Sequence, residues 1–152
     1  MDYKIEVVTV PVSDVDQALE FYTRRAGFAL DVDYHPAAGF RVVQLTPPGS
    51  SCSVQVGTGL TDAAPGSARA TFLAVTDIEA ARRELTERGV KVSDARHKFP
   101  LDDWAGDWRP GPDPERRDYA TFADFADPDG NTWTLQEIGY HADSPHRDEA
   151  AR

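Results

Sequence analysis

The sequence predicts an α+β fold made of two copies of one unit, a strand, a helix and three further strands. Three observations support this prediction. The segment Val12-Ser13-Asp14-Val15 recurs as Val75-Thr76-Asp77-Ile78. Each copy follows a strand-like run and opens a helix-like run. Each helix-like run is followed by short strand-like runs that turn residues separate.

The first unit is expected to occupy residues 1–62. Asp14 and Gln17 have the spacing of a capping box, and Gly27 suits the position just beyond a helix end. The expected strand, helix and three strands cover residues 5–12, 16–25, 29–34, 40–46 and 53–56.

The second unit is expected to occupy residues 63–140, with Thr76 and Glu79 as its capping pair and Gly89 as its helix end. Its strand, helix and three strands are expected over residues 70–75, 79–88, 90–93, 119–125 and 132–138. A long polar loop, 97–117, contains Trp104 and Trp108 and is expected to be a lid over a cavity, a dimer contact or disordered. The tail 141–152 is expected to be flexible.

Composition limits the classes of partner. The chain has 152 residues with a formal net charge of −10, a balance that argues against nucleic acid and anionic membranes as partners. A single cysteine, Cys52, cannot form an internal disulfide, and no apolar run is long enough to span a bilayer. A cytoplasmic location is therefore expected.

Three motifs occur in a fixed order: Val12-Ser13-Asp14 followed by Phe21-Tyr22, the repeated unit, and Asp127-Pro128-Asp129-Gly130-Asn131. Together they resemble the vicinal oxygen chelate superfamily, which groups glyoxalase I, extradiol dioxygenases, fosfomycin-modifying enzymes and bleomycin-resistance proteins. The resemblance covers residues 5 to about 139. It implies two βαβββ modules whose curved sheet surrounds a bowl-shaped cavity, usually in a homodimer. The chemistry on this scaffold varies, so the fold alone does not fix the function.

Metal-dependent members of that superfamily have a His or Gln in the first strand of each module and a Glu in the last strand of each. The matching positions here are Val7, Ala70, Gln55 and Thr134. Valine and alanine cannot bind a metal, and of the four only Gln55 offers a ligand, a weak one. The resemblance therefore implies a member with no metal and no other cofactor.

Strand alternation predicts which side chains would line the bowl. The lining is expected to be mostly apolar, with hydroxyls and amides that can orient a neutral, flat or hydrophobic molecule. The expected ligand-binding residues are Val7, Thr9, Gln55, Phe72, Trp104, Trp108, Thr134 and Gln136. A filled interior that binds no ligand is the alternative interpretation.

The first hypothesis for function is metal-independent binding of a small, largely apolar or aromatic molecule, similar to sequestration by drug-binding resistance proteins. The second is a metal-free isomerase, cyclase or lyase with His97, His35, Tyr34 and Glu137 as candidate catalytic residues. The third is a metal-dependent enzyme of the glyoxalase or dioxygenase type with relocated ligands. An exposed position is the ordinary expectation for a carboxylate such as Glu137. The sequence leaves open whether the chain is an enzyme.

Overall fold

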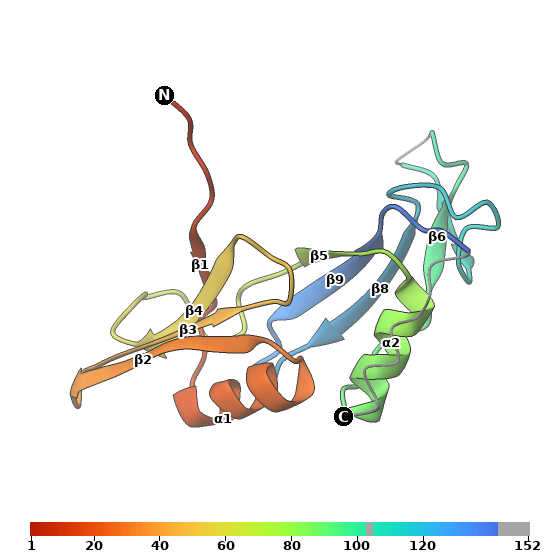
Figure 1. Cartoon of the computed structure of the whole chain (residues 1–152). Helices are drawn as coiled ribbons and strands as arrows, with labels where there is room; N and C mark the ends of the chain where they lie inside the picture. The colour runs from red at the N-terminus through yellow and green to blue at the C-terminus, as the bar shows by residue number, and fades with distance from the viewer. Residues whose placement is uncertain (103–104, 143–152) are drawn as a thin grey trace.

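The structure, a computed structural model, describes residues 1–102 and 105–142. Two mixed sheets lie next to each other, each with a helical segment against one face (Figure 1). The α+β fold of two repeated units predicted from the sequence is confirmed. No helix in the described ranges is long and apolar enough to cross a membrane.

The first unit forms a four-stranded sheet in the order β1-β4-β3-β2, with β1 parallel to β4 and the other neighbours antiparallel. Its helix begins after Asp14, whose side chain accepts a hydrogen bond from the Gln17 amide at 3.0 Å, as the capping pattern predicts. The elements are β1 (Val7–Thr9), α1 (Val15–Glu20), a π-helical turn η1 (Phe21–Arg25), β2 (Ala29–Ala37), β3 (Phe40–Thr46) and β4 (Ser53–Thr58).

The second unit repeats this arrangement and adds one strand, in the order β5-β9-β8-β6-β7. The Asp77 side chain caps its helix by accepting hydrogen bonds from the amides of Glu79 and Ala80. The elements are β5 (Thr71–Val75), α2 (Ile78–Glu87), β6 (Arg96–Phe99), β7 (Asp107–Pro110), β8 (Thr121–Ala126) and β9 (Thr132–Glu137).

One predicted strand is wrong. Residues 90–93 form no strand, and the third element of the second unit is instead β6. Val90 is buried in the core, while Ser93 makes an isolated backbone hydrogen bond to Asp124. The apolar residues of this segment therefore pack in the core, although the backbone of the segment is not paired with a neighbouring strand. The segment 97–117, expected to be a loop, contains part of β6 and all of β7, which pair as an antiparallel hairpin.

The two units share one hydrophobic core, which lies between the sheets and the helices. Tyr22 and Phe28 of the first unit pack against Trp133 of the second, with ring centroids 5.8 and 5.6 Å apart. Trp133 also stacks on Phe125, at 6.3 Å. These rings bury apolar area across the junction, so the two units are packed together and are not independent modules.

The turn between β8 and β9 ties the second unit to the first. The buried Asp127 carboxylate accepts hydrogen bonds from the Tyr22 hydroxyl at 2.7 Å and from the backbone and side-chain nitrogens of Asn131. The Asn131 side chain also donates to the Pro11 carbonyl at 2.8 Å. Burial, and then the charge of Asp127, raise the pKa of Tyr22. The segment Asp127-Pro128-Asp129-Gly130-Asn131 is thus both a turn and a buried polar junction between the two units.

Candidate functional site

Each sheet has one face that no described segment covers, called here its open face. Figure 1 shows the helices on the opposite faces, where the shared core lies. In the first sheet, Val7 and Thr9 of β1 pair with Ser53 and Gln55 of β4, so the four side chains share the open face. The Gln55 side-chain amide donates to the Thr9 hydroxyl at 2.8 Å. The predicted grouping of Val7, Thr9 and Gln55 on one face is confirmed.

In the second sheet the register aligns Phe72 with Thr134, and Phe122 with Gln136. These side chains share the open face with Trp108 of β7. Phe72 and Trp108 both contact Phe122 edge to face, with ring centroids 6.2 and 5.1 Å away. Phe72 is 55% exposed and Trp108 43% exposed. We call these three rings the aromatic platform.

Two cations lie against the platform. The Arg96 guanidinium is 4.5 Å from the centroid of the Trp108 ring, and the Lys98 ammonium is 4.2 Å from it. Arg96 also donates to Asp124 at 2.6 Å, which fixes its position beside the ring. The open face therefore combines aromatic surface with positive charge at one edge. Arg96, Lys98 and Phe122 were not among the residues predicted from the sequence, although the alternation of side chains along 121–126 carries the signal for Phe122.

The polar groups of this face are held in place by neighbours. The Thr134 hydroxyl donates to Asp124 at 2.9 Å, and the Gln136 side-chain amide donates to the Tyr119 carbonyl at 3.3 Å. Their remaining acceptor atoms are hydroxyl and amide oxygens, which do not change charge, and the Thr134 side chain is buried. Trp104, the other predicted ligand-binding residue, lies outside the described residues.

The positions that bind metal in metal-dependent relatives do not fit a metal here. Val7 and Ala70 offer only hydrocarbon, which leaves the Thr134 hydroxyl and the Gln55 amide oxygen, two weak neutral ligands that lie on different sheets. Within residues 1–102 and 105–142, no three His, Cys, Asp or Glu side chains lie close enough together to hold an ion.

The structure does not bring the four predicted catalytic residues together. Tyr34 and His35 lie on β2 of the first sheet, while His97 lies on β6 and Glu137 on β9, two strands that β8 separates. The expectation that Glu137 is exposed is wrong, because its side chain is fully buried. It accepts two hydrogen bonds from Arg116, at 2.7 and 2.6 Å, and one from the Ile78 amide at 2.9 Å. These bonds make Glu137 an anchor for the start of α2.

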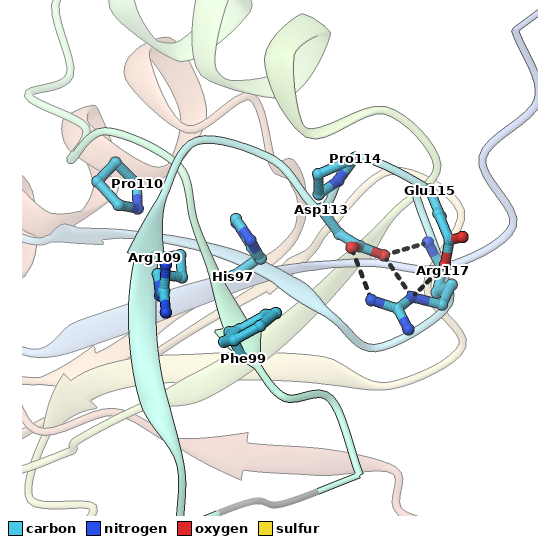
Figure 2. Close-up of a pocket in the computed structure, with 8 residues that line it drawn as sticks. All are labelled: His97, Phe99, Arg109, Pro110, Asp113, Pro114, Glu115 and Arg117. Carbon is cyan, nitrogen blue, oxygen red and sulfur yellow. Dashed lines mark hydrogen bonds and ion pairs between the residues drawn. The ribbon is translucent and has the colours of Figure 1, made fainter.

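His97 lies at a different place, in a groove on the face of the β6–β7 hairpin opposite to Trp108. Figure 2 shows the eight residues that line this outer groove, whose volume is about 510 Å³. At one end Arg117 donates two hydrogen bonds to the buried Asp113, at 2.8 and 2.9 Å. These bonds hold the pKa of the Asp113 carboxyl at about 2. The lining residues are His97, Phe99, Arg109, Pro110, Asp113, Pro114, Glu115 and Arg117.

Comparison with known proteins gives one family. The profile of the Glyoxalase/Bleomycin resistance protein/Dioxygenase superfamily matches residues 4–135. Among solved structures, TnmS3, an antibiotic binding protein from Streptomyces sp. CB03234, is 30% identical, with a TM-score of 0.67 over 90% of this chain and 96% of that chain. A glyoxalase/bleomycin resistance protein from the same strain is 30% identical, with a TM-score of 0.65 over 88% and 100%. A superfamily member from Sphaerobacter thermophilus DSM 20745 is 28% identical, with a TM-score of 0.67 over 90% and 98%. No curated protein matches.

Proposed function

Because this chain belongs to the Glyoxalase/Bleomycin resistance protein/Dioxygenase superfamily, we propose that it binds a small aromatic or largely apolar molecule on the open faces of its sheets. Sequestration of the molecule, without a metal ion or chemical conversion, is the function that this site supports best. The likeness to TnmS3, an antibiotic binding protein, agrees with this class of function.

The observation that carries the proposal is the aromatic platform. Exposed aromatic side chains are costly to leave in water, and soluble monomers rarely gather large apolar side chains on one uncovered face. Phe72 and Trp108 are fixed by edge-to-face contacts with Phe122, so they do not need to be ordered when a ligand arrives. A flat ring laid on this surface gains stacking and burial at little entropic cost.

The polar groups around the platform define the ligand further. Lys98 places positive charge against the Trp108 ring, Arg96 lies there paired with Asp124, and Thr134 and Gln136 add hydroxyl and amide groups. These groups suit carbonyl or hydroxyl oxygens on an aromatic scaffold, because such oxygens accept hydrogen bonds from cations and amides. The proposed ligand is therefore a flat, conjugated molecule with several oxygen substituents.

A second copy of the chain completes the cavity in this proposal. The open face of the first sheet also carries exposed apolar side chains, with Tyr34 57% exposed. The open face of one protomer's first sheet, set against the platform of its partner, would enclose a ligand on two sides and cover both apolar surfaces. The exposed apolar residues on this open face include Val7, Val32, Tyr34 and Phe40.

The binding test uses a panel of neutral polycyclic quinones, titrated against wild type and against Trp108→Ala and Phe72→Ala. Loss of either ring is expected to weaken binding about tenfold or more, as stacking on one aromatic side chain is worth about 1–3 kcal/mol. Tyr3→Ala is the matched control, because Tyr3 is an exposed aromatic side chain that precedes β1 and lies outside both sheets. Equal affinities for all four proteins would contradict the proposal.

Two further measurements test its other parts. Affinity is expected to be the same after dialysis against a chelator and after addition of Zn, Ni, Mn or Fe(II), because the four family positions offer no adequate donor set. A chelator-dependent loss of binding would contradict metal independence. Sedimentation is expected to show a dimer that Tyr34→Asp converts to a monomer, since a buried unpaired charge opposes association. A wild-type monomer would contradict the shared cavity.

A further inference from the structure

The β6–β7 hairpin presents different side chains on its two faces. Arg96 and Lys98 both contact the Trp108 ring on the open face. His97, Phe99 and Arg109 line the outer groove on the other face (Figure 2). Because successive strand residues alternate between faces, the outer groove is a place separate from the aromatic platform. It is also outside the function proposed above.

His97 directs an unused acceptor into the outer groove. Its side chain lies 2.8 Å, through Nδ1, from the Gly111 carbonyl oxygen, and a carbonyl can only accept, so Nδ1 carries the hydrogen. In the neutral ring, Nε2 is then an acceptor. Nε2 has no hydrogen-bond partner among the described residues, although His97 is only 8% exposed. No fully buried side-chain nitrogen or oxygen of the described residues lacks a partner, so Nε2 is accessible to solvent, and the groove is the surface that His97 lines.

Arg109 supplies an unpaired cation next to this acceptor. Its guanidinium lies 4.3 Å from the centroid of the Phe99 ring, and no carboxylate of the described residues comes within ion-pair distance of it. Arg117, by contrast, is neutralised by Asp113 and Glu115. The register places His97 directly opposite Arg109, so the free cation and the free acceptor are cross-strand neighbours.

We propose that the outer groove is a second binding site, for a small aromatic carboxylate that also carries a hydroxyl or N–H group. The ring packs on Phe99 and the groove prolines, the carboxylate pairs with Arg109, and the hydroxyl or N–H donates to His97 Nε2. The groove volume of about 510 Å³ lies in the range of small-molecule sites and holds one or two rings. This one class of molecule matches both groups of the groove, because its carboxylate pairs with the Arg109 cation and its hydroxyl or N–H donates to His97.

The test follows backbone amide shifts by NMR while 3-hydroxybenzoate or 4-hydroxybenzoate is added to the full chain. Saturable shifts are expected at His97, Phe99 and Arg109. Benzoate, which lacks the donor, and the methyl esters, which lack the charge, are each expected to bind about tenfold more weakly, because each loses one of the two polar contacts.

Two variants separate the contacts. Arg109→Gln removes the cation and is expected to weaken binding about tenfold, whereas Arg24→Gln removes a cation from the first unit and serves as the matched control. His97→Asn keeps a donor for the Gly111 carbonyl but removes Nε2, so hydroxybenzoate is expected to bind it no better than benzoate. If His97→Asn does not fold, Arg109→Gln and the ester series still decide the outcome.

Three results would overturn the proposal. They are the absence of saturable shifts below about 10 mM ligand, wild-type affinity in Arg109→Gln, and shifts at Phe72 and Trp108 in place of the groove residues. The last result would place the hydroxybenzoates on the aromatic platform. Failure of the platform variants to affect the quinones leaves this test unaffected, since the two sites use different residues and different probes.

Discussion

Replacing Tyr22 with Phe removes a single hydroxyl from the junction between the two units. That hydroxyl donates to the Asp127 carboxylate at 2.7 Å and accepts from the Trp133 indole nitrogen at 3.0 Å. A hydrogen bond to a charged group contributes about 1.5–3 kcal/mol, and a buried donor without a partner costs about 1–3 kcal/mol. Part of the first loss is recovered because Asn131 still donates to the same carboxylate oxygen. The expected loss in the free energy of unfolding is about 2–4 kcal/mol.

Urea denaturation followed by circular dichroism measures this loss, with the m-value expected to stay unchanged. Tyr34→Phe is the matched control, because its hydroxyl is on an exposed side chain of β2, and a change below about 0.5 kcal/mol is expected. A loss below about 1 kcal/mol for Tyr22→Phe would refute the view that this network fastens the two units.

The same residue predicts how stability responds to alkali. Burial, reinforced by the charge of Asp127, raises the pKa of Tyr22 above its ordinary value of 10.0. The folded protein therefore keeps this proton while the unfolded chain loses it, so the stabilisation is complete below pH 10 and declines as the pH rises further. The decline is about 1.4 kcal/mol per pH unit for this one group. Tyr22→Phe is expected to have a shallower slope above pH 10, and identical slopes would contradict the assignment.

Other perturbations concern the second unit. Arg116→Ala leaves the buried Glu137 carboxylate with only a backbone donor and is expected to cost about 3 kcal/mol in urea denaturation, so a neutral effect would contradict the anchor role. Asp113→Asn is expected to be less stable than wild type at pH 7. The difference should close as the pH falls from 3.8 to about 2, because the Arg117 hydrogen bonds lower the Asp113 pKa; a constant difference in acid titration would refute this. Asp77→Ala removes the cap of α2 and should lower the melting temperature by an amount equivalent to about 1 kcal/mol, unlike the exposed control Glu84→Ala.

The repeated helices and strands were predictable because the short-range sequence patterns favour the same elements that the packed core requires. Capping residues, helix-ending glycines and alternating strands place both helices and most strands close to their observed positions. The hairpin was not predictable in this way, because Arg96, Lys98 and Asp107 interrupt any apolar alternation. Its strands are instead held by backbone pairing and by cations stacked on Trp108, contacts that form only once the two strands lie side by side.

The candidate site was predictable in part for a related reason. Side chains two residues apart on a strand share a face, which correctly groups Val7 with Thr9. The register between β1 and β4 then adds the residues of β4 to that face. The partners of Glu137 were not predictable, because Arg116 adopts a backbone conformation with φ of 50° that no sequence pattern signalled. Whether the grouped residues bind a ligand stays a prediction.

The hairpin explains how one short element could serve two sites without conflict. It joins β8 through two register pairs, Arg96 with Phe122 and His97 with Thr121. The Lys98 amide adds a hydrogen bond to the Ala120 carbonyl, and Phe99 lies beyond this paired part. Single substitutions there change one face only, because neighbours in the strand point to opposite sides. A one-residue insertion within β7 would instead exchange the faces, placing Arg109 at the platform and Trp108 in the outer groove. Both proposed sites therefore depend on the length of this strand more than on any single side chain.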